Sequence, residues 1–222
     1  MNSAFNINHL SFLLQGAAWT IVLSLISFLG GGLLGFVVAL ARISRNRPIR
    51  WLALGYMQVI QGTPLLVVMF LAYFSLSMLG FNLPAIVAAG ISMTIYVGAY
   101  VGDIWRGAIQ AVPKTQWEAA ECLALTRAQR LGMVILPQAL RIATPPTVGF
   151  MVQIVKNTSL ASVVGFVELA RAGQIVNNAL FKPFLIYMLV AGLYFALSYP
   201  LSLWSRKLEN KLLVTRRVQA ES

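Results

Sequence analysis

The sequence is poor in the residues that carry metal, disulfide and acid–base chemistry. It has one cysteine, Cys122, one histidine, His9, and only six acidic residues among 222. A single cysteine excludes an internal disulfide and a multi-cysteine metal site, and His9 has no obvious ligand partners. Paired carboxylates, or a serine with histidine and aspartate, are not arranged for catalysis. We therefore expect a chain that holds no metal and is not itself an enzyme.

Charge is also scarce, and long uncharged stretches take its place. Charged residues form 10% of the chain and hydrophobic residues 59%, whereas an ordinary globular domain is about 25% charged. A bilayer core of about 30 Å needs roughly 20 apolar residues per helix. The longest uncharged runs are residues 1–41, 51–102, 142–155 and 183–205. These runs predict an all-α integral membrane protein, with residues 1–222 forming a single transmembrane domain.

Turn residues and charges divide these runs into about five transmembrane helices. Arg42 and Pro48 end the first run, and the turn-rich segment 80–84 divides the second. Thr63-Pro64 predicts a kink within the second helix. Gly62, Thr63 and Pro64 together favour a break there near the pathway, with a kink that serves only packing as the alternative. The expected helices span residues 13–41, 51–78, 84–105, 138–166 and 183–204. Glycines at 30–32 and 35 favour close internal packing of the first helix.

The basic residues predict how the chain is oriented. The net charge of +11 is placed between the apolar runs, which argues against a nucleic-acid surface. Lys and Arg number four in residues 42–50, five in 106–141 and five after 205, so 14 of 17 lie on one side. The positive-inside rule makes that side cytoplasmic, with the N-terminus outside and the C-terminus inside. The first ten residues have no positive segment, so no cleaved signal peptide is expected.

The polar segment between the third and fourth expected helices predicts a short amphipathic helix. Thr115 and Glu118 have the spacing of a capping box, which predicts a helix over residues 115–131. Composition alone favours an interfacial helix lying on lipid headgroups. Its apolar face would consist of Trp117, Ala120, Ala124, Ala128 and Leu131.

The same segment resembles the cytoplasmic loop of the permease subunits of ATP-binding-cassette importers. That loop carries Glu-Ala-Ala, a glycine four residues after the second alanine, and then Ile-x-Leu-Pro. Glu118-Ala119-Ala120 and Leu136-Pro137 match in register. Ala124 stands in place of the glycine and Val134 in place of the isoleucine. The change at Ala124 would stiffen the middle of the loop.

Further segments, in the expected order, resemble the polar amino acid branch of these permeases, which includes histidine, glutamine, glutamate and arginine types. In two of them, Gln61 replaces the branch's arginine and Asp103 replaces its glutamate. The segments are Gln61-Gly62-Thr63-Pro64-Leu65-Leu66-Val67, Ala99-Tyr100-Val101-Gly102-Asp103-Ile104-Trp105-Arg106-Gly107-Ala108, Leu136-Pro137-Gln138-Ala139-Leu140-Arg141 and Lys156-Asn157-Thr158-Ser159-Leu160. Together they are more specific than any one of them alone.

The resemblance implies a type I importer permease in the bacterial cytoplasmic (inner) membrane. Its implied partners are a second permease subunit, identical or related, two ATP-binding-cassette ATPase subunits and an extracytoplasmic amino acid binding protein. ATP and Mg²⁺ would bind to the ATPase and no cofactor to this chain. Gly102 and Gly107 have P-loop spacing, but Ala108 replaces the lysine. Helix 115–131 would be the coupling helix, with Glu118, Ala119, Ala120, Ala124 and Arg127 as its ATPase-coupling residues.

Polar residues at membrane depth indicate the expected pathway. An ionised lysine there costs about 2.5–3.5 kcal/mol, so Lys156 should face a wet cavity, an ion-pair partner such as Glu168, or the headgroups. We expect Asn157 to contact the substrate. Many relatives carry aspartate at that position, so the amide favours a neutral or acidic amino acid. The other expected pathway residues are Thr158 and Ser159, whose hydroxyls have backbone bonding as their commoner use, and Gly62 and Thr63 near the kink.

Two other classes of function fit the composition. An ion-coupled secondary transporter of small polar solutes would use Lys156, Asp103 and Glu168 as a relay. It predicts activity without an ATPase and an inverted repeat, which the sequence does not show. A membrane scaffold predicts no substrate dependence. For Asp103 and Arg106, three residues apart, a local ion pair is the default expectation.

Overall fold

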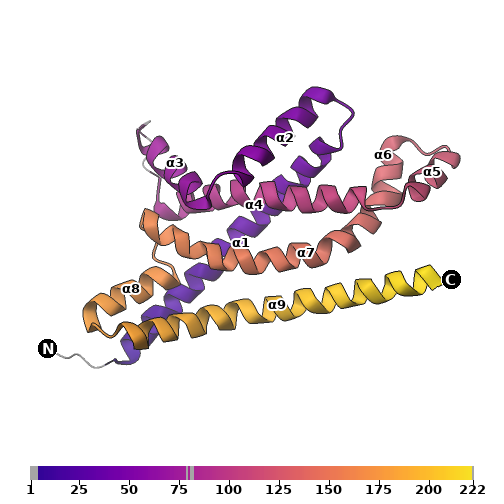
Figure 1. Cartoon of the computed structure of the whole chain (residues 1–222). Coiled ribbons are helices and arrows are strands. Elements are labelled where there is room, and N and C mark those ends of the chain that lie inside the picture. The colour runs from indigo at the N-terminus through magenta and orange to yellow at the C-terminus, as the bar shows by residue number, and fades with distance from the viewer. Residues whose placement is uncertain (1–4, 79, 81–82, 222) are drawn as a thin grey trace.

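The computed structural model describes the chain except residues 1–4, 79, 81–82 and 222, and except the side chains of 76 and 213–221. Every element in the described part is helical, as predicted (Figure 1). The elements are α1 (Ile7–Arg42), α2 (Arg47–Gln61), α3 (Leu65–Met78), α4 (Ala85–Gln110), α5 (Lys114–Cys122), α6 (Arg127–Gln129), η1 (Arg130–Ile135), α7 (Leu136–Asn157), η2 (Thr158–Val164), α8 (Leu169–Leu180) and α9 (Pro183–Glu221).

Up to five membrane spans can be built from these helices. Among the described residues, α1, α4 and α9 as far as Leu212 are each long and apolar enough to cross a bilayer. Two bent pairs pass the same test: α2 with α3, and the stretch Arg127–Val164 with α8. These five units correspond in order to the five predicted helices.

The second predicted span is broken rather than kinked. A bend of 103° separates α2 from α3 at Gly62, Thr63 and Pro64, so the expectation of one helix over 51–78 is wrong. Proline lacks the N–H that would continue the ladder, and its ring disfavours helical geometry in the residue before it. The break favoured at Gly62, Thr63 and Pro64 is therefore present, and the alternative of a kink within a continuous helix is not.

Between the fourth and fifth predicted helices lies a helix that the sequence did not predict, α8. The α-helix α7 ends at Asn157, and a 3₁₀ stretch, η2, follows it to a left-handed Gly165 with φ of 87°. The expected helix over 138–166 is therefore too long. After it, α8 buries Leu169, Ala172 and Val176, whose spacing of three and four residues is the helical signal that was overlooked.

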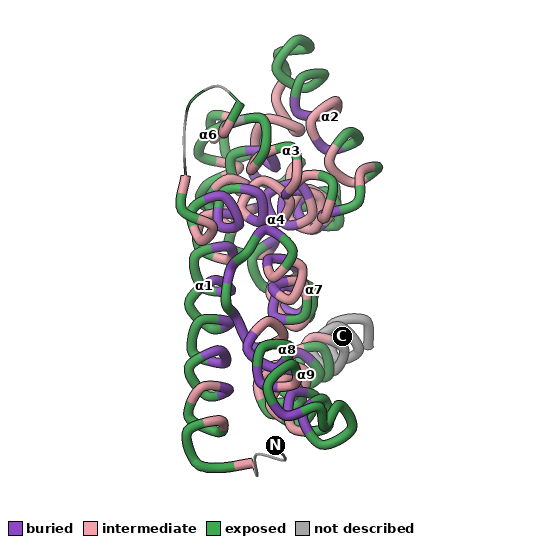
Figure 2. The backbone as a smooth tube through the Cα atoms, turned by 90° about the vertical axis from the view of Figure 1, so that its left-hand side faces the viewer, coloured by how far each residue is buried: buried purple, intermediate pink, exposed green. Residues whose placement is uncertain are grey.

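Glycines allow α1 to pack closely against α4. A Cβ added at Gly31 would lie 2.4 Å from the Val97 side chain, and one at Gly35 would lie 2.9 Å from the Gly102 nitrogen. The predicted internal packing is confirmed for Gly30, Gly31 and Gly35, whereas a Cβ added at Gly32 would meet nothing within 4 Å. In Figure 2, buried positions recur along α1 on the side turned toward the other helices. We call the contact at Gly31 and Gly35 the glycine seam.

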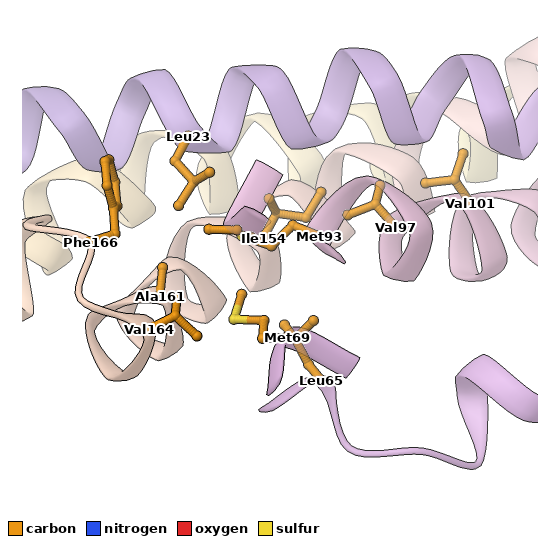
Figure 3. Packing of buried hydrophobic residues seen from close by; sticks show 11 residues of the cluster. Leu23, Leu65, Met69, Met93, Val97, Val101, Ile154, Ala161, Val164 and Phe166 are labelled. Carbon is orange, nitrogen blue, oxygen red and sulfur yellow. The ribbon is translucent and has the colours of Figure 1, made fainter. Parts of the chain in front are cut away.

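A central apolar cluster joins the spans. Leu23 of α1, Met93 and Val97 of α4 and Ile154 of α7 meet there (Figure 3). The cluster also includes Leu65 and Met69 of α3, and Ala161 and Val164 of η2. The α2–α3 break and the end of α7 are thus held in one packed region.

Glu168 ties α8 to α9. Its carboxylate is fully buried and accepts hydrogen bonds from the backbone N–H groups of Ala170 (2.9 Å) and Arg171 (2.8 Å), so it caps α8. The Tyr194 hydroxyl of α9 also donates to it. The ion pair suggested between Lys156 and Glu168 is therefore wrong for this structure, because Glu168 is already satisfied by neutral donors.

Candidate functional site

Residues 114–135, comprising α5, α6 and η1, project beyond the ends of α4 and α7 (Figure 1). We call them the α5–η1 segment. Its first helix starts at Lys114 after Pro113, and no side chain caps it. The capping box predicted for Thr115 and Glu118 is therefore wrong. A capping box occurs instead at α6, where the Gln129 N–H donates to Thr126 Oγ1 and the Thr126 N–H donates to Gln129 Oε1.

The segment turns sharply at Ala124, so the single helix predicted over 115–131 is wrong. Ala124 has φ of 54°, in the left-handed region. Its N–H donates to the Glu121 carbonyl (2.9 Å) and the Leu125 N–H donates to the Ala120 carbonyl (3.3 Å). These two bonds form a Schellman motif, whose left-handed position is usually glycine. This geometry gives a physical reason for the glycine of the resembling loop at this position.

The break also divides the predicted apolar face. Ala120 is buried, and Trp117 and Leu131 pack against a cluster made by the ends of α4 and α7. Ala124 and Ala128, which were predicted on the same face, are exposed. The helical register is lost at the turn, so the face cannot continue across it.

The predicted ATPase-coupling residues fall into two groups. Glu118, Ala119 and Ala124 are exposed on the segment's surface. Ala120 is buried, at 2% exposure, and supports α5 from below. Arg127 is half-buried, and its Nη2 donates to the Ile43 carbonyl oxygen at 2.7 Å. Only the first group has side chains placed on an open surface.

The predicted pathway residues near the end of α7 also differ in exposure. Lys156 is exposed and Asn157 is half-buried, with its Oδ1 accepting from Gln153 Nε2 at 3.2 Å. Thr158 is fully buried, and its hydroxyl donates to the Val155 carbonyl. The Ser159 hydroxyl donates to the carbonyl of Lys156. The hydroxyls of Thr158 and Ser159 therefore bond to the local backbone, which is the commoner use expected from the sequence.

The α2–α3 break places Gly62 and Thr63 at an irregular turn. The Thr63 hydroxyl donates to the Val59 carbonyl at 2.7 Å, and Gln61 Nε2 reaches the Ala99 carbonyl of α4 at 3.4 Å. Gly62 has a close approach of its own, because an added Cβ would lie 2.9 Å from the Gln58 carbonyl oxygen. The turn is therefore held from α2 and from α4.

An open cavity with a mixed polar and apolar lining lies between α4 and α7 near the α5–η1 segment. It has a volume of about 450 Å³ and is lined by Asp103, Arg106, Ile142 and Pro146, among others. Arg106 Nη2 and Nε lie 2.6 and 2.9 Å from Asp103 Oδ1, so the predicted ion pair is present. Nη1 of Arg106 also donates to Gln110. Sequence spacing predicted the pair but not the cavity beside it.

The described part of the chain holds no cluster of three or more His, Cys, Asp or Glu side chains that could bind a metal. The three members of the suggested relay do not contact one another. Asp103 pairs with Arg106, Glu168 bonds with α8 and Tyr194, and Lys156 is exposed. The structure therefore gives no support to a proton or ion relay through these residues.

The family model of binding-protein-dependent transport system inner membrane components matches residues 31–213. The L-cystine transport system permease protein of Bacillus subtilis is 37% identical over 198 residues, covering 89% of this chain and 85% of that protein. The probable glutamine ABC transporter permease protein GlnM of the same species is 34% identical, covering 96% of this chain and 98% of that protein.

Solved structures show the same architecture. A chain from the crystal structure of an amino acid ABC transporter with histidines has a TM-score of 0.87 and 31% identity, covering 94% of this chain and all of that one. A chain of a methionine ABC transporter in an inward-facing conformation has a TM-score of 0.80 at 17% identity, with 93% and 99% covered. The second likeness shows the fold alone.

Proposed function

The chain belongs to the family of binding-protein-dependent transport system inner membrane components, and from that premise we propose that it is the membrane-spanning subunit of an ATP-driven amino acid importer. The observation that carries the proposal is the match along 94% of the chain to a subunit of an amino acid transporter. Relatives named for glutamine and L-cystine transport support the same class of substrate.

Energy for transport comes from partner ATPases, which hold ATP and Mg²⁺. The α5–η1 segment is the docking element, because Glu118 and Ala119 lie on its surface while Trp117 and Ala120 anchor it to the ends of α4 and α7. This arrangement lets one face of α5 bind a partner while the other transmits force to the bundle. A second permease subunit completes the pathway, and an extracytoplasmic binding protein delivers the amino acid.

The pathway passes the α2–α3 break and the junction of α7 with η2. Irregular backbone at membrane depth is tolerated where protein buries it or where it lines a wet cavity. Leu65 of α3 and Val164 of η2 already share one apolar cluster, so the two irregular regions are neighbours. Lys156 is exposed and Asn157 half-buried at this junction, and Gly62 and Thr63 approach from the break.

The α5–η1 segment faces the cytoplasm, together with the C-terminus. The connection from α1 to α2, the α5–η1 segment and the far end of α9 lie toward one side of the molecule, while the N-terminal end of α1 lies toward the other (Figure 1). Residues 42–50, 106–141 and those after 205, which contain these three regions and the adjoining helix ends, carry 14 of the 17 basic residues, which favours the cytoplasm for that side. A reporter fused after Ser222 that is active only in the periplasm would overturn this orientation.

Co-purification tests the proposal. We expect the chain, isolated gently from its native membrane, to retain an ATP-binding-cassette ATPase whose turnover rises when binding protein and a neutral amino acid such as glutamine are added. Turnover that no amino acid changes would contradict the substrate class. Absence of any such ATPase from a folded, active preparation would contradict the proposal itself.

A further inference from the structure

The Arg127 side chain joins two distant parts of the chain. It extends from α6 into the protein, and its Nη2 lies 2.7 Å from the carbonyl oxygen of Ile43, a residue 84 positions earlier. The side chain is half-buried. Arg127 therefore makes a specific contact inward, instead of contributing a free cation to the docking surface.

The contact point is the end of the first transmembrane helix. Ile43 is the C-cap of α1, and its own N–H donates to the Ala39 carbonyl. Carbonyl groups at a helix C-terminus lack partners within the helix, and a cation there is also favoured by the helix dipole. The guanidinium of Arg127 thus acts as a charged C-cap for α1 that is supplied by the α5–η1 segment.

The α5–η1 segment is braced so that its two arms move together. Arg130, one turn beyond Arg127, places Nη1 2.9 Å from Glu121 Oε2 near the end of α5. This ion pair crosses the turn at Ala124. A displacement applied to α5 is therefore passed to α6, which holds Arg127.

The end of α1 that Arg127 contacts belongs to a tightly packed unit formed by α1 and α4. Ile43 packs against the cluster that includes Ala108 of α4 and Ala139 of α7. Higher in the bundle, the glycine seam locks α1 to α4. Movement of the α1 end is consequently movement of the α1–α4 pair.

We propose that Arg127 is a positioning residue that transmits movement of the α5–η1 segment to α1, and so links hydrolysis on the ATPase to rearrangement of the spans. The inference rests on the proposed function and adds a defined mechanical connection to it. Apolar packing through Trp117 meets the side chain of Ile43 only by way of the shared cluster at the α4 and α7 ends, whereas Arg127 makes a direct hydrogen bond to the end of α1.

The test is the ratio of amino acid taken up to ATP hydrolysed, measured on the complete transporter in lipid vesicles with its binding protein. Arg127→Gln removes the charge and the guanidinium fork. We expect the ratio to fall roughly fivefold or more, which is the lower range of coupling between distant sites. Arg127→Lys, which keeps a positive donor, should recover part of the loss. Arg45→Gln is the matched control, since Arg45 is exposed and outside the α5–η1 segment.

A second arm replaces the hydrogen bond with a covalent link. In a Cys122→Ser background, Arg127→Cys and Ile43→Cys are joined by a reagent with a flexible spacer, and the link should raise the ratio above that of the unlinked pair. An unchanged ratio of uptake to hydrolysis in Arg127→Gln would overturn the inference. A parallel fall of uptake and hydrolysis that neither Arg127→Lys nor the covalent link corrects would also overturn it. Neither result touches the proposed function, which is tested separately by ATP-driven uptake in the unaltered transporter.

Discussion

Adding one methyl group at Gly31 should weaken the protein, while adding one at the next residue should not. A Cβ at Gly31 would lie 2.4 Å from both Cβ and Cγ1 of Val97, whereas a Cβ at Gly32 meets nothing within 4 Å. Ordinary contact begins at 3.4 Å. Gly31→Ala therefore requires the facing atoms of α1 and α4 to separate by about 1 Å.

The matched pair isolates this contact. Glycine to alanine in a helix interior gains about 1 kcal/mol of propensity at either position. Overpacking of a well-packed contact costs about 1–3 kcal/mol. Gly32→Ala should thus raise the free energy of unfolding by up to about 1 kcal/mol. The free energy of unfolding of Gly31→Ala should be lower than that of Gly32→Ala by about 1–3 kcal/mol.

Unfolding of the purified chain in mixed detergent micelles, titrated with dodecyl sulfate and followed by tryptophan fluorescence, measures the difference. Adding Val97→Ala to Gly31→Ala removes the clashing Cγ1 of Val97 and leaves its Cβ as the one remaining close side-chain contact, so the double variant should be more stable than the sum of the single changes predicts. Equal dodecyl sulfate midpoints for Gly31→Ala and Gly32→Ala would refute the close contact at the glycine seam. Free energies of unfolding that are strictly additive for Gly31→Ala and Val97→Ala would refute it as well.

Four further outcomes are expected. Ala124→Gly should slow hydrogen exchange at the amides of Ala124 and Leu125, because relief of the left-handed strain favours the turn by about 1 kcal/mol; unchanged exchange would refute it. Glu168→Ala should lower the free energy of unfolding by about 2 kcal/mol or more, and Tyr194→Phe should lower it by about 1 kcal/mol. Denaturant titration measures both values, and free energies equal to that of the unaltered chain would contradict the role of Glu168. Glu118→Lys should reduce ATP-driven uptake with normal membrane insertion, since it reverses a charge on the exposed face of α5; full uptake in well-expressed protein would contradict docking through that face. Asn157→Asp should shift uptake toward cationic amino acids, and competition among Arg, Gln and Glu with an unaltered ranking would remove Asn157 from the substrate site.

The sequence predicted the spans because bilayer thickness leaves a direct mark on composition. The run from residue 51 to 102 has no charge, and only membrane helices explain such a stretch in a folded chain. The sharpness of the α2–α3 bend was not predictable, since Gly62-Thr63-Pro64 fits both a kink and a full break. Packing of α3 against α4 and η2 decides between them, and that packing is a tertiary property.

The α5–η1 segment shows a different limit. Its register and its anchors, Trp117 and Ala120, followed from helical spacing. The turn at Ala124 did not, because alanine is a strong helix former and its left-handed geometry runs against local propensity. The contact of Arg127 with Ile43 has no local signal at all. It joins residues 84 positions apart, and only the folded arrangement brings them together.

We propose that this chain carries amino acids across the membrane only when its ATPase partners supply energy. The most direct measurement is uptake of labelled glutamine into vesicles that contain the chain, its permease partner, the binding protein and internal ATP, with and without the ATPase subunits. We predict uptake that requires both ATPase and hydrolysable ATP. Glutamine uptake that proceeds without the ATPase and follows an imposed ion gradient would contradict the account.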